Sequence, residues 1–293
     1  MRPLTASVVL EVWERGRGLH PVDRALVLLA AAQPGAPWEQ LARLSIGQRD
    51  AQLLSLRELT FGPRLASYAE CPVCGERLEF DHQVSDFLAS PAVNTENGGT
   101  EHRLAAPTTQ IFGGYTVRFR LPDSFDLAAV ASSGDPEIAR RVLLERCVVD
   151  VAQIASGVAQ IASGVAQRTS GVAQMGDLTE AVAPKTSADA IKTNSTYPVA
   201  IGDLPGEIAA QIAEQIERAD PGADISLNLI CPACDHRWQI TFDIVTFFWA
   251  EINHLAKRLL REVHTLARAY GWREADILAM SAARRQAYLE MVL

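Results

Sequence analysis

The longest hydrophobic pattern in the chain lies near its C-terminal end. Apolar residues recur at spacings of three and four from Val245 to Tyr270, which predicts an amphipathic helix of about seven turns. Gly271 follows as a left-handed C-cap. Two further helices, at 272–280 and from 282 behind Ser281, complete a C-terminal helical region, residues 245–293. A second face of the long helix carries basic side chains at spacings of four, three and four: Lys257, Arg261, His264 and Arg268.

Residues 5–62 carry four shorter helical patterns that end at glycine, proline or serine. Pro21 stands in the first turn of the second pattern, where its missing N–H costs nothing. Ser45-Ile46-Gly47 is interpreted as a break before the fourth pattern. The four patterns predict an N-terminal helical region, residues 1–63, that forms a small bundle or a packed cap.

The middle of the chain mixes strand and helix signals. Residues 115–121 alternate strictly between polar and apolar positions, as in a strand. Asp123 or Ser124 can cap the helix that follows, and a second helix is predicted at about 135–149. A third begins near Pro205, with isoleucine at every fourth position. We interpret residues 108–150 and 201–224 as an inserted αβ unit.

Residues 151–174 form a tandem repeat, VAQIASG, VAQIASG, VAQRTSG, VAQ. A seven-residue apolar period is compatible with a short coiled-coil helix. One glycine per heptad costs about 1 kcal/mol relative to alanine, and the repeat has no charges at the flanking positions. These costs favour the second interpretation, a flexible linker that spans residues 151–200.

Two CPxC turns carry the strongest chemical signal. Cys71 and Cys74 form the first, Cys231 and Cys234 the second, and each turn lies between an apolar run and alternating apolar residues. A structural Zn²⁺ takes four ligands in a closed tetrahedral site, so we expect the two turns to share one ion in a split zinc ribbon, residues 64–89 and 225–244. The alternatives are two unrelated turns, a redox pair, or His236 as a substitute ligand. The predicted fold class is therefore α+β and mostly helical, with a split Cys₄ zinc-ribbon core, the inserted αβ unit and a long C-terminal helix.

Composition narrows the function. The net charge of −8 argues against non-specific nucleic-acid binding. No signal peptide and no membrane span are predicted, and cysteines in CxxC pairs fit a reducing compartment, so a cytoplasmic location is expected. Cys147 is interpreted as a buried core thiol. Because the chain carries none of the common catalytic motifs, we expect no enzyme and no small-molecule substrate.

Several stretches together resemble one family. They are HPVDRALVLLAAAQP, LSIGQRDAQLLSLRELTFGPRL with ECPVCGERLEF, YTVRFRLPDSFDL, CPACDHRWQITFDIVTFFWAEI and the C-terminal GWREADIL…RRQAYLEM. The set resembles the base-plate hub assembly proteins of contractile-tailed phages and of phage-tail-like contractile injection systems. The resemblance leaves out residues 151–200. It implies a non-enzymatic assembly chaperone or minor structural component whose partners are hub and spike proteins.

The C-terminal helix is the expected partner-binding element, because it combines exposed basic residues with aromatic ones: Trp249, Lys257, Arg261, Arg268 and Trp272. Two alternatives stay open. One is a zinc-ribbon nucleic-acid-binding module. The other is a metal-dependent enzyme that uses one CPxC turn with an open coordination position.

Overall fold

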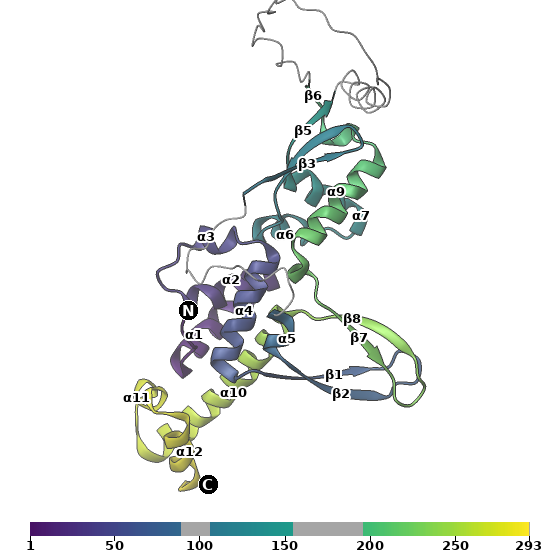
Figure 1. The fold of residues 1–293 in the computed structure, drawn as a ribbon. Coiled ribbons are helices and arrows are strands. Elements are labelled where there is room, and N and C mark those ends of the chain that lie inside the picture. Colours follow the sequence, from purple (N-terminus) through teal and green to yellow (C-terminus); the bar gives the residue numbers. More distant parts are fainter. Residues whose placement is uncertain (89–105, 155–195, 293) are drawn as a thin grey trace, which may run out of the picture.

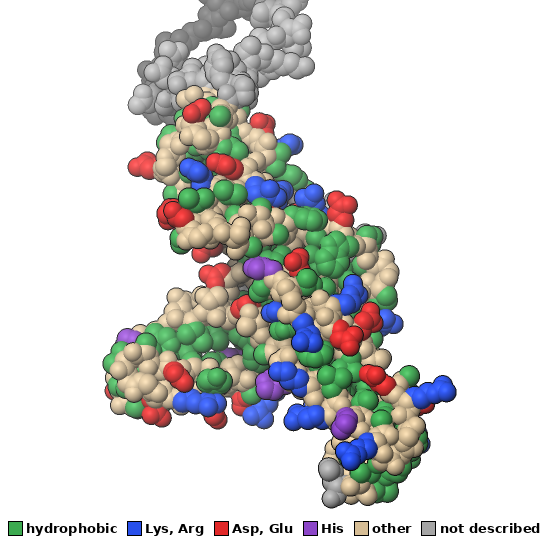
Figure 2. Space-filling view, turned by 180° about the vertical axis from the view of Figure 1, so that it is seen from behind, with side chains coloured by type: hydrophobic (Ala, Val, Ile, Leu, Met, Phe, Trp, Pro, Cys, Tyr) green, Lys and Arg blue, Asp and Glu red, His purple; other side chains and the backbone are tan. Residues whose placement is uncertain are grey.

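A computed structural model describes residues 1–88, 106–154 and 196–292 (Figure 1). A helical body occupies the middle of the molecule, and an αβ unit lies at one end of it. Two β-hairpins project together from the side of the body as an arm, and the last helices lie at the end opposite the αβ unit. Figure 2 shows the same outline from behind, with the arm standing clear of the rest.

The helical body is built around the largest apolar core of the described chain. Leu28, Leu53, Phe248 and Ile252 are among the residues that it buries completely. Arg57 is 3% exposed and donates two hydrogen bonds, of 2.9 and 2.6 Å, to the carboxylate of Glu251. The body consists of α1 (Ala6–Gly16), α2 (Pro21–Ala32), α3 (Trp38–Ala42), α4 (Ile46–Phe61), α5 (Val84–Leu88) and the first half of α10 (Ile244–Tyr270).

The start of α4 differs from the expected break. Ser45 is the N-cap of this helix, and its hydroxyl accepts a hydrogen bond from the amide of Gln48 while the Gln48 side chain bonds back to the amide of Ser45. This reciprocal capping box satisfies two amides that the first turn leaves without a partner. The serine therefore begins the helix and does not interrupt it.

The αβ unit contains an antiparallel four-stranded sheet in the order β3 (Thr108–Phe112), β4 (Tyr115–Phe119), β5 (Val148–Ile154), β6 (Thr196–Pro198). Ile208 and Ile212 pack with the sheet residues Val117 and Phe119 in a separate small core. The helices of the unit are α6 (Ser124–Val130), α7 (Pro136–Cys147) and α9 (Gly206–Ala219), with the 3₁₀ turns η1 (Ile201–Asp203) and η2 (Pro221–Ala223).

The boundaries of this unit correct the expectation from the sequence. The helix predicted at 135–149 ends at Cys147, and β5 continues to Ile154. Residues 151–154 and 196–198 are therefore sheet strands and not linker. The remainder of the heptad repeat lies outside the described residues.

A polar joint attaches the αβ unit to α4. Asp123 caps α6 and accepts a hydrogen bond of 3.2 Å from Arg43. The amide of Gly47 donates a hydrogen bond of 2.9 Å to the carboxylate of Asp220. A Cβ on Gly47 would overlap that carboxylate, and the backbone of Gly47 also lies close to Gly222 in η2. A larger residue at position 47 would therefore displace the Asp220 carboxylate.

The arm consists of two separate antiparallel hairpins. The first pairs β1 (Arg64–Glu70) with β2 (Arg77–Gln83), and the second pairs β7 (Ser226–Ile230) with β8 (Arg237–Thr241). Half-buried and exposed residues alternate along most of each strand, as expected of sheets with one covered face. At the base of the arm the rings of Phe87 and Phe242 stack with centroids 4.9 Å apart.

The C-terminal helices α11 (Glu274–Ala279) and α12 (Ala282–Glu290) fold back on the end of α10. Gly271 ends α10 at φ +69°, the left-handed conformation expected from the sequence. Leu266, Ile277 and Leu289 form a small core between the three helices. No helix among the described residues is long and apolar enough to cross a bilayer.

Candidate metal centre

The two CPxC turns have the same backbone structure at the far end of the arm. In the first, the amide of Cys71 donates to the carbonyl of Glu76, and the amide of Gly75 donates to the carbonyl of Cys71. In the second, the amide of Cys231 donates to the carbonyl of His236, and the amide of Asp235 donates to the carbonyl of Cys231. All four hydrogen bonds are 2.9 Å long. Each turn therefore presents two thiols from one rigid loop.

The residue after the second cysteine adopts a left-handed conformation in both turns. Gly75 has φ +72° and Asp235 has φ +57°. Glycine adopts this conformation without strain, whereas aspartate is one of the few other residues that tolerate it. The second turn is thus the more strained of two otherwise equivalent loops.

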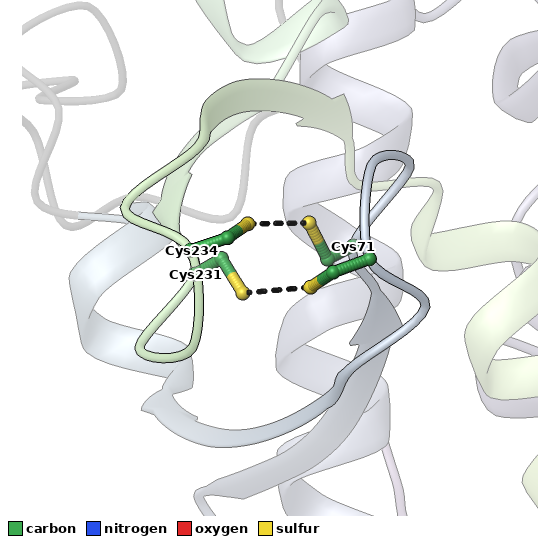
Figure 3. Close-up of side chains that lie close together, drawn as sticks. Cys71, Cys231 and Cys234 are labelled. Carbon is green, nitrogen blue, oxygen red and sulfur yellow. Dashed lines mark hydrogen bonds between the residues drawn. The ribbon is translucent and has the colours of Figure 1, made fainter.

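The four thiols converge between the two hairpins (Figure 3). Their sulfur atoms all lie within 4.8 Å of one another. The Sγ atoms of Cys71 and Cys234 are 3.7 Å apart, and those of Cys74 and Cys231 are 3.5 Å apart. Cys71 and Cys231 are buried, while Cys74 and Cys234 are exposed.

These distances fit a tetrahedral metal site. Zn–S bonds of about 2.3 Å place two ligand sulfurs about 3.8 Å apart, close to both measured separations. A disulfide needs about 2.0 Å, so neither pair is bonded. Four cysteines within reach of one ion can fill a tetrahedral site completely and leave no position for a reacting water.

The thiols influence one another's ionisation. Burial raises the pKa of Cys71, but hydrogen bonds from the backbone of Cys74 and Val73 outweigh burial and lower this pKa to about 7. A backbone hydrogen bond at His236 lowers the pKa of Cys234, yet the neighbouring thiols raise it to about 12. Four sulfurs this close cannot all carry negative charge unless a cation lies between them.

The other candidate ligands lie apart from this cluster. The ring of His236 stacks on Trp238 with centroids 5.9 Å apart. The possible metal-binding group found among the described residues consists of the four cysteines and includes no histidine. Cys147 is 1% exposed in the core of the αβ unit, and burial raises its pKa to about 12. The prediction of a buried core thiol is confirmed.

The five residues predicted to bind a partner divide into two groups. Lys257, Arg261 and Arg268 are exposed on α10. Trp249 packs against Gly16 of α1. The guanidinium carbon of Arg24 lies over the Trp249 ring, 4.9 Å from the ring centroid. Trp272 stacks on Tyr270 and meets the edge of Tyr288: the ring centroids are 4.4 and 4.8 Å away. Both tryptophans therefore pack within the protein, and their role in partner binding stays a prediction.

A family model described as T4 bacteriophage base plate protein matches residues 33–249. The match covers more than half of the chain and includes both CPxC hairpins and the polar joint. The chain belongs to this family. Its role is that of a base-plate protein, and its partners are other base-plate proteins. No curated protein and no solved structure matches the chain.

The matched residues include three of the stretches that carried the resemblance: the LSIGQRD stretch with the first CPxC turn, the YTVRFRLPDSFDL stretch and most of the second CPxC stretch. The LSIGQRD stretch begins α4 and supplies Gly47 of the polar joint, while LPDSFDL supplies Asp123 on the other side. The two CPxC stretches supply the thiols. These base-plate family segments therefore attach the αβ unit to the helical body and bring the two hairpins of the arm together at their far ends.

Proposed function

We propose that the protein is a non-enzymatic assembly factor or minor structural component of the base-plate hub and spike in a contractile, phage-tail-like machine. The observation that carries the proposal is the family match over residues 33–249. The four-thiol cluster supports it, since a closed site stabilises a fold and offers no position for a substrate.

We further propose that the metal is one structural Zn²⁺ held by Cys71, Cys74, Cys231 and Cys234. The Sγ separations of 3.5 and 3.7 Å support this ion. Substitution with Co²⁺ would report the ligand set directly, and we expect a tetrahedral four-sulfur spectrum. A spectrum with a nitrogen or oxygen ligand would refute the closed site and reopen the metal-dependent enzyme.

In the proposed role, the exposed face of α10 docks onto the hub or spike. Lys257, Arg261 and Arg268 are exposed there and point to an acidic surface on the partner. The helix is anchored in the body at one end and by α11 and α12 at the other, so the face is presented on a rigid element.

The test combines purification of native assemblies with loss of the gene. We expect the tagged protein to carry hub or spike subunits with it, and assembly of complete base plates to fail when the gene is deleted. Complementation of the deletion with a Cys147→Ala chain, which retains all four ligands, should restore assembly and is the matched control. Normal particles after deletion would refute an assembly role, and salt-sensitive binding to DNA or RNA instead would favour the nucleic-acid module.

A further inference from the structure

An acidic groove lies where the αβ unit meets the helical body. Its volume is about 500 Å³, and it lies between α9, η2 and the turn after β4. Exposed carboxylates stand on its rim at Glu214, Glu217 and Asp224. Five of its other lining residues are apolar: Pro122, Ala213, Ile216, Pro221 and Ala223.

The charges of the groove leave it with a net negative field. Arg218 is the cation among the residues that line it, and this arginine forms an ion pair with Glu214 on the same helix. Asp220 is turned away toward the amide of Gly47. Glu217 and Asp224 have no ion-pair partner among the described residues, so the groove suits a segment that carries positive charge beside an apolar side chain.

The chain itself presents such a segment at its other end. Lys257, Arg261 and His264 follow one exposed face of α10. Figure 2 shows several blue and purple side chains on the part of the molecule that leads to the C-terminal helices. Leu260 lies between them on the same helix face and is 38% exposed. An apolar side chain flanked by cations is the complement of an apolar floor flanked by carboxylates.

We propose that the α10 face of one copy docks in the α9–η2 groove of a second copy. The groove and the α10 face lie on different parts of the molecule, so a single contact is head-to-tail and leaves one unfilled groove and one free face on the pair that it joins. Such contacts form rings or open chains according to the rotation between neighbours. This association uses the α10 face that is also proposed to dock a hub or spike subunit, so one face holds either a second copy or that subunit at a time.

The experiment measures the mass of the full-length, metal-loaded chain by sedimentation velocity from low to high salt. We expect association that increases with protein concentration and weakens as salt rises, because the contact pairs exposed charges. Glu217→Lys/Asp224→Lys and Lys257→Glu/Arg261→Glu should each weaken association about tenfold or more. A 1:1 mixture of the two variants should restore it, because each reversed surface then faces its complement.

The matched control reverses two exposed glutamates outside the groove. Glu11→Lys/Glu39→Lys changes the net charge as much as the groove variant does, and it should leave association unchanged. A wild-type chain that stays monomeric at low salt would overturn the proposal, as would equal effects of the groove and control variants or a mixture that fails to associate. None of these results would contradict the proposed role in the base plate, because that role is tested by gene deletion and by purification of native assemblies.

Discussion

Loss of the metal should open the arm before it unfolds the helical body. The perturbation is Cys231→Ser, which replaces a fully buried ligand. Beyond their bases the hairpins have half-buried faces, and the proposed metal would link their far ends through the four thiols. At the base, Leu65 and Val84 belong to the main core and Phe87 stacks on Phe242. The structure therefore places the cost of metal loss in the outer parts of β1, β2, β7 and β8.

The magnitude follows from ligand linkage. A metal that binds only the closed arm, at a free concentration a thousand times its Kd, stabilises that state by about 4 kcal/mol. Because 1.4 kcal/mol is about a factor of ten in an equilibrium constant, amides protected by the closed arm should exchange about a thousandfold faster without the metal. Amides in α4 and in the first half of α10 should change far less.

Native-state hydrogen exchange with mass spectrometry measures the protection of the amides in the arm and in the helical body, and metal analysis measures the number of ions per chain. Cys147→Ala is the control, because it removes a buried thiol outside the cluster and should retain one ion per chain. The reasoning is refuted if the Cys231→Ser chain keeps a full complement of metal. It is also refuted if the arm strands stay protected, or if α4 loses protection as completely as they do.

Three single substitutions test the polar joint at Gly47, the second CPxC turn at Asp235 and the ion pairs of Asp126. Gly47→Ala should destabilise the fold by about 1–3 kcal/mol because its Cβ overlaps Asp220, whereas Gly18→Ala, with open space around it, should stay within about 0.5 kcal/mol; urea unfolding measures both. Asp235→Gly should increase stability by up to about 1 kcal/mol because it removes left-handed strain, and equal or weaker metal retention against a chelator would contradict this. Asp126→Asn should cost about 1.5–3 kcal/mol at pH 7, because two partly exposed arginines lose their buried carboxylate, and the same urea experiment at low pH should show a smaller loss.

The low-pH result for Asp126 follows from the sign of its pKa shift. Burial raises this pKa, but hydrogen bonds from Arg120 and Arg146, among others, lower it below its usual value of 3.8. A carboxyl whose pKa is depressed in the folded state contributes stability above its unfolded pKa, and that contribution disappears as pH falls through the folded value. The difference between wild type and Asp126→Asn should therefore shrink below about pH 4. A difference that stays constant down to pH 2 would show that the ion pairs are not its source.

Local signals in the sequence predicted the elements whose structure is decided locally. The apolar stripe and Gly271 define α10, Asp123 caps α6, and the spacing of two CPxC turns predicted that four thiols share one site. The helix and its caps depend on residues a few positions apart. The shared thiol site was predicted because a structural Zn²⁺ takes four ligands. The sequence also predicted two separate turns meeting, because one turn supplies only half of a tetrahedral site.

Features decided by distant partners were not predicted. β5 runs from Val148 to Ile154 and shares its last residues with the pattern of the repeat, so its strand character appears only when it pairs with β4. Gly47 and Asp220 are 173 positions apart, and Arg57 and Glu251 are 194 apart. No periodicity within one segment indicates which distant carboxylate will face a helix terminus or a buried guanidinium. The partners of Trp249 on the apolar face of α10 were not predicted for the same reason, because Gly16 and Arg24 lie on other helices.

The arm and the αβ unit are held to the body by independent means. The four thiols meet at the far end of the arm, where the proposed metal would close it, and the Phe87–Phe242 stack closes its base. Two segments about 160 positions apart therefore form one projection. The αβ unit, which the chain inserts between those segments, is attached instead through Asp123 and Asp220 at the start of α4. Metal loss should therefore alter contacts that a partner makes with the arm and leave contacts at the α9–η2 groove unchanged. Gly47→Ala should do the reverse, so the two variants together can assign any base-plate contact to one part of the molecule.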